Sequence, residues 1–406
     1  MHMSFYSIVP FFACMLIVVA LSATPLFAAA DAPSNSLSRR IVTLDGLRGF
    51  LALAVFFHHS SIYHRFLLGA PWALPPSRFY ALLGQMGVAF FFMITGYLFW
   101  SRLLEHGQTN WVRLYIGRVF RIGPLYLAAI AAMLVFVAVR TRLHLHVPVG
   151  ELIHQVGRWL ELGFVVGPDV NGYGNTTLIL AGVTWTLHYE WVFYLALPYL
   201  ALFARYKWLH LPIAAAILIV IFSGDPSGFN YSTLFLAGMI SASLLRAGLI
   251  LRLPNHVASV LVLALIGAAF ASCRTAYAAL PILLMGPAFY LIASGCTLFG
   301  LLTCRPARRL GEISYGIYLL QGLVLTVVLR PAPLRAIAVA SPLGHWALVC
   351  LAAIFLVVVA TMAHRCIERP GIALGKRVSD LIEFTTWDAF SKKVLGKKAL
   401  LFVNKK

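Results

Sequence analysis

The sequence predicts an all-α fold: a polytopic transmembrane helical bundle of ten core spans, with a possible extra helix at the N-terminus. Of the 406 residues, 61% are hydrophobic and only 11% are charged, and the mean hydropathy is +0.87. Soluble domains carry about 25% charged residues. The apolar runs are hydrophobic on all sides, and short basic loops separate them. This pattern is typical of helices that face lipid.

The ten core spans follow the apolar runs in order. We place them at residues 44–64, 80–102, 119–139, 184–204, 209–223, 231–249, 256–273, 277–300, 314–330 and 343–364. They form a membrane domain at 38–375, between an N-terminal apolar segment at 1–37 and a basic tail at 376–406. No internal repeat is evident.

The apolar run at 5–29 has two interpretations. Residues 28–30 are alanines, as at a signal-peptidase site, but residues 1–7 carry no Lys or Arg. Cleavage would also release Arg39 and Arg40 on the outer side. An uncleaved extra helix with its N-terminus outside therefore fits better.

The basic residues predict the orientation. If Arg39 and Arg40 are cytoplasmic, 24 of the 32 lysines and arginines fall on that side and eight arginines on the other. This is the positive-inside rule, so the protein is expected in the cell's inner membrane with its C-terminus cytoplasmic. The net charge of +19 then reflects topology and contact with anionic lipid rather than nucleic-acid binding.

The first core span carries Arg48 and His59. Eleven residues of helix advance roughly 16 Å and return to within about 20° of the starting direction, so both side chains share one stripe. The guanidinium lies near a membrane surface and the imidazole near mid-bilayer, whereas His58 points about 100° away. An imidazole is costly to keep in lipid, which favours a functional role for His59 over a simple helix-to-helix hydrogen bond.

The third span begins with Arg118 and Arg121, which lie on one helix face. Two guanidiniums so placed can hold phosphate oxygens bidentately, although arginines that only set topology would look the same. Residues 140–183 form the long outer connection, which is either a lid or acceptor-binding element or a solvated connector. Its His144, His146 and His154 are explained by a polar loop, and we predict no metal site. Nor do the six scattered cysteines indicate a disulfide framework or a metal site.

Glu190 is a carboxylate placed well inside the fourth span. An unpaired charge there costs several kcal/mol, so it needs a partner or a proton. Glu190 lies about 9 Å from the outer face, a depth that His59 approaches from the inner face. One expectation is a hydrogen bond that orients the imidazole of His59, and the alternative is a polar clasp between helices.

Together these residues resemble the acyltransferase 3 family of integral membrane O-acyltransferases, from about residue 41 to 375. The similar segments are Arg48 with His59 (the family's Arg/Lys-ten residues-His signature), 91–98, Arg118 with Arg121, 184–194, 313–320 and 368–370. Thr95 stands where serine is commoner, His188 and Tyr189 replace small residues, and Gln321 occupies a place that is often histidine. The chain resembles the stand-alone type, without a fused extracellular hydrolase-like domain.

The resemblance implies catalysis by His59 and an acyl-CoA donor at Arg118 and Arg121. We expect acetyl-CoA as co-substrate, Arg48 beside those two arginines, Glu190 assisting His59, and no metal. The acceptor would be a hydroxyl of a cell-surface or exported carbohydrate or another hydroxyl compound. The sequence leaves open the acceptor's identity, the acyl group and the oligomeric state.

Two other functions remain open. A multi-pass transporter or flippase for a glycan or lipid-linked sugar also uses buried His, Glu and Arg, although it usually shows inverted repeats. A non-catalytic membrane scaffold of the same fold is the other alternative.

Overall fold

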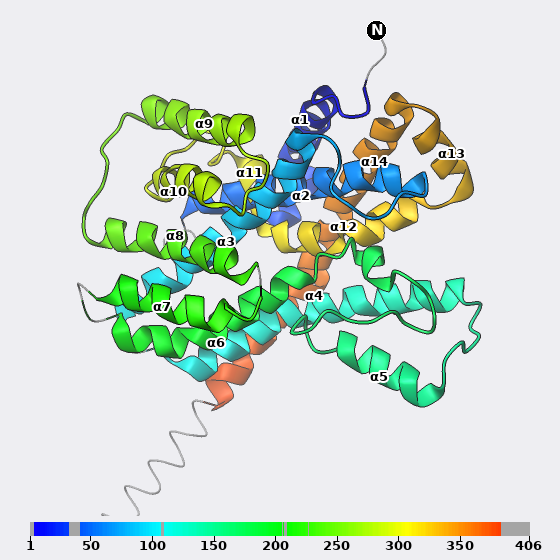
Figure 1. Ribbon diagram of the computed structural model, residues 1–406, viewed down its shortest axis with the longest axis horizontal. Coiled ribbons are helices and arrows are strands. Elements are labelled where there is room, and N and C mark those ends of the chain that lie inside the picture. The colour runs from blue at the N-terminus through cyan, green and yellow to red at the C-terminus, as the bar shows by residue number, and fades with distance from the viewer. Residues whose placement is uncertain are drawn as a thin grey trace, which may run out of the picture.

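The computed structural model describes residues 4–31, 41–106, 109–204, 206, 209–225 and 227–382. In these residues the regular elements are all helices, joined by non-helical connections, and there is no β-strand (Figure 1). Arg39, Arg40 and most of the predicted basic tail lie outside the described residues.

The helices follow the order of the apolar runs. They are α1 (Val9–Ala23), η1 (Pro25–Ala30), α2 (Val42–Leu67), α3 (Arg78–His106), α4 (Trp111–Arg140), α5 (Val149–Trp159), η3 (Thr176–Leu180), α6 (Trp185–Phe203), α7 (His210–Phe222), α8 (Gly228–Arg246), α9 (Asn255–Ser272), α10 (Ala279–Ala293), α11 (Arg305–Glu312), α12 (Ser314–Leu329), α13 (Ala332–Ala340), α14 (Pro342–Ala363) and the π-helical turn η4 (His364–Glu368).

Each of the ten predicted spans overlaps one helix, but ten membrane crossings are not confirmed. Among the described residues, four helices are long and apolar enough to cross a membrane: α3, α4, α9 and α14 with its continuation. The pair α11 and α12, bent by 68°, would be a fifth if it forms one broken span. Helices α7 and α10 have only 13 and 15 residues, fewer than the ~17–25 that a crossing needs.

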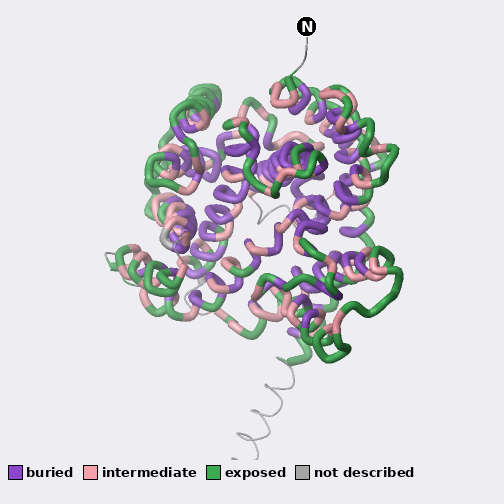
Figure 2. The backbone as a smooth tube through the Cα atoms, turned by 45° about the vertical axis from the view of Figure 1, so that its right-hand side comes forward, coloured by how far each residue is buried: buried purple, intermediate pink, exposed green. Residues whose placement is uncertain are grey.

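The buried residues concentrate where α2 and α3 pack with α8, α11, α12 and α14 (Figure 2). The contact between α3 and α8 depends on two glycines. A Cβ at Gly96 would collide with the Phe235 carbonyl, and a Cβ at Gly238 would collide with the Met93 carbonyl. Gly96 is therefore a close-approach glycine that lets α3 and α8 pack closely.

The N-terminal segment packs against α11 and α14. Trp346 Nε1 donates to the Phe5 carbonyl at 3.0 Å. At the other end of the segment, Asp31 pairs with Arg309 at 2.7 Å and with Arg305 at 2.8 Å. Arg309 is only 1% exposed, so the Asp31 carboxylate supplies a counter-charge for a buried guanidinium.

The long connection at 140–183 contains α5 and η3 and is tied together by Asn171. The Asn171 side chain donates to Thr141 and to the His144 carbonyl, and it accepts from the His146 amide. Its backbone has a positive φ of 52°, which makes the tight turn that the Asn- and Gly-rich sequence predicts.

Candidate active site

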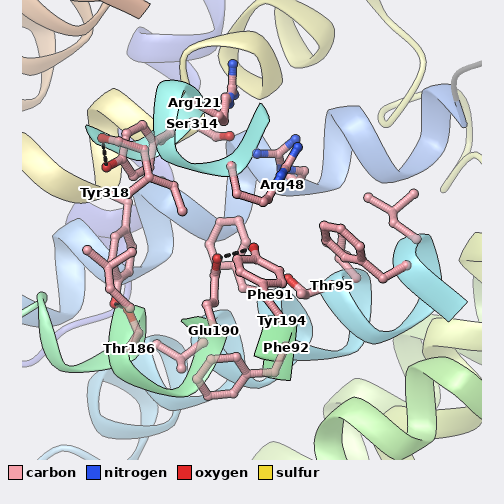
Figure 3. A pocket seen from close by; sticks show the side chains of 18 residues that line it. Arg48, Phe91, Phe92, Thr95, Arg121, Thr186, Glu190, Tyr194, Ser314 and Tyr318 are labelled. Atoms are coloured by element: carbon pink, nitrogen blue, oxygen red, sulfur yellow. Dashed lines mark hydrogen bonds between the residues drawn. The ribbon is translucent and has the colours of Figure 1, made fainter. Parts of the chain in front are cut away.

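A cavity of about 140 Å³ lies among α2, α3, α4, α6 and α12 (Figure 3). Its polar lining residues are Arg48, Thr95, Arg118, Arg121, Thr186, Glu190, Tyr194, Ser314, Tyr315 and Tyr318. Arg48 and Arg121 face it from one side, and Glu190 and Thr186 lie on the other. The structure therefore brings together the three arginines that the sequence singled out, and we call this space the arginine cavity.

Helix α4 places two of these arginines. It begins after Asn110, whose side chain accepts a hydrogen bond from the Arg113 amide and so caps the helix. The next turns carry Arg118 and Arg121 on one face. The Arg118 guanidinium lies 5.2 Å from the centre of the Phe99 ring, a cation–π distance. Arg121 lies 3.6 Å from the buried carboxylate of Glu368.

Glu190 faces the arginines and forms no hydrogen bond with His59. Its carboxylate accepts a hydrogen bond of 2.6 Å from the Tyr194 hydroxyl, one turn along α6 (the dashed line in Figure 3). The expectation of a Glu190–His59 hydrogen bond is therefore wrong for this structure. The physical reason is that the Tyr194 hydroxyl, one turn along the same helix, is within reach of the carboxylate, which therefore points into the arginine cavity.

His59 is half-buried and is held by Gln321 of α12. Its Nδ1 lies 3.1 Å from Gln321 Oε1, while Gln321 Nε2 donates to the Tyr318 carbonyl at 2.7 Å. Because the amide nitrogen is committed to that carbonyl, the oxygen faces His59 and accepts a hydrogen bond from Nδ1–H. The Nε2 lone pair of His59 is then free to act as a base or nucleophile.

The neighbouring histidine has a different environment. His58 is buried, and its Nδ1 lies 2.7 Å from the Tyr80 carbonyl on α3. A carbonyl only accepts, so this hydrogen bond fixes His58 as a structural link between two helices. The two histidines have different hydrogen-bond partners, although their rings meet edge to face with centroids 5.0 Å apart.

An aromatic ring covers one side of His59. Trp72, in the connection after α2, stacks on its ring with centroids 6.0 Å apart and planes at 19°. Towards the arginine cavity, Tyr318 forms a hydrogen bond of 3.0 Å with Thr186 and an edge contact with Phe91. His59 is not among the residues that line the cavity. One turn of α12, from Tyr318 to Gln321, separates the two features.

The comparison with protein families agrees with the motif spacing. A family described as an acyltransferase domain matches residues 41–362 of the 406. The chain belongs to the acyltransferase 3 family. No curated protein and no solved structure matches it. With its apolar helices, membership identifies the protein as a multi-pass membrane acyltransferase.

Within this acyltransferase, the sequence indicated some site residues and missed others. Tyr194 could have been found, because it lies four residues after Glu190 on the same helix face. The resemblance marks Gln321 only as standing where histidine is common, whereas the structure makes it the partner of His59 from 262 residues away. Tyr318 lies in the family-like segment 313–320, but that resemblance gave it no role, and Trp72 carried no sequence signal beyond its aromatic character.

The outer-loop histidines make ordinary loop contacts. His144 Nδ1 lies 2.9 Å from the Arg142 carbonyl. Across the described ranges of this acyltransferase, no group of three or more His, Cys, Asp or Glu side chains could hold a metal ion.

Proposed function

We propose that the protein transfers a short acyl group, acetyl, from cytoplasmic acyl-CoA to a hydroxyl of a cell-surface or exported carbohydrate. The arrangement along α2 carries this proposal. Arg48, in the early turns of the helix, lines the arginine cavity, and His59 lies about 16 Å farther along the same helix. A thioester that approaches from the arginine cavity and a hydroxyl that approaches from the other end of α2 would meet at the imidazole of His59.

Arg48, Arg118 and Arg121 provide the donor site in this proposal. Guanidiniums bind phosphate oxygens through paired, charge-assisted hydrogen bonds, and CoA carries such phosphates. The cavity of about 140 Å³ is well below the ~300–1,000 Å³ of ordinary ligand pockets. It therefore receives only part of the donor, and the thioester arm must displace the Phe91–Tyr318 contact to reach His59.

His59 performs the proton transfer. The acceptor hydroxyl attacks the thioester carbonyl carbon while Nε2 of His59 takes the hydroxyl proton. The carbon–sulfur bond breaks, the ester forms, and the CoA thiolate leaves with the proton returned by the imidazolium. The free Nε2 also suits a covalent route through an acylated His59. Incubation with radiolabelled acetyl-CoA in the absence of acceptor would reveal this intermediate as label on the protein.

Glu190 has a different role from the one that its sequence position indicated. Its carboxylate lies in the arginine cavity and is bonded to Tyr194. We assign it to the charge balance of the donor site, where it offsets the repulsion among three guanidiniums until phosphate binds.

Replacement of His59 tests the proposed reaction. Full-length protein in membranes is supplied with radiolabelled acetyl-CoA, and label on carbohydrate is measured. General-base catalysis contributes roughly 10²- to 10⁴-fold, so His59→Ala should lose at least about 99% of transfer. His144→Ala, on the exposed loop, is the matched control and should transfer normally.

The same assay separates the alternatives. Retention of more than about a tenth of wild-type transfer by His59→Ala excludes the catalytic role. Movement of unmodified glycan without label would support a transporter or flippase. Neither label nor movement would support a scaffold.

A further inference from the structure

Arg330 differs from the other arginines that the sequence places on the outer side. Of these eight, Arg65, Arg78, Arg140, Arg142, Arg274 and Arg335 are exposed to solvent. Arg158 is half-buried and pairs with Glu161 at 3.5 Å. Arg330 is half-buried too, but it forms no ion pair with any carboxylate in the described part of the chain.

Two phenols and two aromatic faces hold Arg330 in place. Its Nε donates to the Tyr63 hydroxyl at 3.0 Å, and its Nη1 donates to the Tyr173 hydroxyl at 2.8 Å. The guanidinium carbon lies 5.5 Å from the centre of the Phe66 ring and 6.0 Å from that of Phe136. Nη2 has no hydrogen-bond partner among the described residues and is not sealed from solvent.

None of these contacts neutralises the charge. The Tyr63 hydroxyl accepts a hydrogen bond from Arg330 and can donate one to Thr326, 2.9 Å away. Both phenols accept hydrogen bonds from Arg330 and so orient the guanidinium. A half-buried charge that is oriented but not compensated is costly, and a bound anion would remove that cost.

This guanidinium lies close to His59. Tyr63 follows His59 by one turn of α2, and its ring centre is 5.7 Å from that of Trp72. Trp72 in turn stacks on His59. We call Tyr63, Trp72, Tyr173 and Arg330 the outer cluster. Tyr63 lies on α2, Trp72 in the connection after α2, Tyr173 in the 140–183 connection and Arg330 directly after α12. The outer cluster therefore lies beside the reactive ring, and none of its members lines the arginine cavity.

We propose that the outer cluster binds the acceptor, and that the acceptor is an anionic saccharide whose carboxylate or phosphate binds Nη2 of Arg330. This inference rests on the proposed acyl transfer and adds the charge of the acceptor to it. The half-buried Trp72 supplies a flat apolar face for the sugar ring. Arg330 supplies a planar guanidinium edge that can donate hydrogen bonds to either a carboxylate or a phosphate.

A binding measurement without acyl-CoA tests this proposal. The full-length protein in detergent is titrated with three soluble probes: methyl glucoside, methyl glucuronide and glucose 6-phosphate. A charge-assisted hydrogen bond makes the better anionic probe bind about tenfold or more tightly than the neutral one. The two anionic arms show whether carboxylate or phosphate is preferred.

Variants identify the residue responsible. Arg330→Gln should reduce the anionic preference to less than about twofold, and Arg330→Lys should keep part of it because the charge remains. Arg335→Gln is the control, since Arg335 is exposed and donates to the Leu67 carbonyl. It should bind all three probes as the wild type does.

The outcomes are distinct from those for acyl transfer. Equal binding of the three probes by the wild type, or no binding, overturns the anionic-acceptor proposal, whether or not acetyl groups are transferred. An anionic preference that survives Arg330→Gln also overturns it. Anionic preference that depends on Arg330, in a protein that transfers no acetyl group, would leave the binding site standing and refute the proposed reaction.

Discussion

The hydrogen bonds of Gln321 determine which nitrogen of His59 is free to react. Gln321 donates to the Tyr318 carbonyl, so it can only accept from His59 Nδ1. The neutral amide of Gln321 thus orients the imidazole of His59, a role that the sequence analysis expected for Glu190. No charge from this partner favours the protonated imidazole.

Substitution of Gln321 tests that role. Gln321→Leu should lower kcat for acetyl transfer by about tenfold or more, since the tautomer of His59 is no longer selected. The KM for acetyl-CoA should change little. Gln321→Glu adds a carboxylate that favours the protonated imidazole, so the acid limb of the pH–rate profile should move to higher pH. A profile that both variants leave unchanged would show that Gln321 is only a packing residue.

Arg121 allows a similar test of the donor site. Arg121→Ala removes a guanidinium from the arginine cavity, so the KM for acetyl-CoA should rise about tenfold or more, while preference among acceptors stays constant. Arg113→Ala is a suitable control, because Arg113 lies on the same helix but pairs at the surface with Asp380. Equal effects of Arg121→Ala on donor and acceptor would count against the assignment.

Much of the helical framework could be predicted from sequence, because burial in lipid imposes apolar runs that each become a helix. The ten predicted ranges all overlap helices. The number that cross the membrane could not be read in the same way. Helices such as α7 and α10 are apolar yet short, and tertiary contacts rather than length decide their placement.

From the spacing of residues alone, the candidate site could be predicted only within single helices, whereas the placement of Arg48 beside Arg118 and Arg121 came from the family resemblance. Arg48 and His59, or Arg118 and Arg121, follow from helical periodicity. The partners of His59 and Glu190 depended on how separate helices pack. Glu190 was assigned to the wrong neighbour because depth in the bilayer does not determine the direction in which a side chain points.

The segment before α2 makes a prediction of its own. Hydrogen bonds from Arg309 and Arg305 hold the pKa of Asp31 below its ordinary value. A lowered pKa contributes stability above the unfolded-state value of about 4, and this stability is lost as the pH falls towards the folded-state value. Asp31→Asn should therefore lower the Tm in detergent at pH 7 by several degrees.

The pH dependence of the Asp31→Asn effect is the internal control for this prediction. The difference in Tm between wild type and Asp31→Asn should shrink as the pH is lowered below about 4, because the carboxyl then binds a proton in the unfolded chain while the folded state still holds it ionised. Asp380→Asn removes an exposed ion pair and should change the Tm little at either pH. A Tm that does not respond to Asp31→Asn would mean that the N-terminal segment does not support the bundle.

The distribution of charge along the entire chain predicts the orientation of the bundle in the membrane. The predicted cytoplasmic face carries three times as many lysines and arginines as the other, 24 against eight. The three arginines of the cavity were assigned to that face, and Arg330 to the opposite one. In our proposal the acyl group therefore crosses part of the membrane between donor and acceptor, by way of His59.

Acetyl transfer in sealed vesicles of known orientation tests this most directly. Radiolabelled acetyl-CoA, which does not cross membranes, is added outside inside-out and right-side-out vesicles that contain the carbohydrate acceptor. We predict label on carbohydrate inside the inside-out vesicles, no label in right-side-out vesicles, and loss of label with His59→Ala. Equal labelling in both orientations, or labelling that persists without His59, would contradict the account.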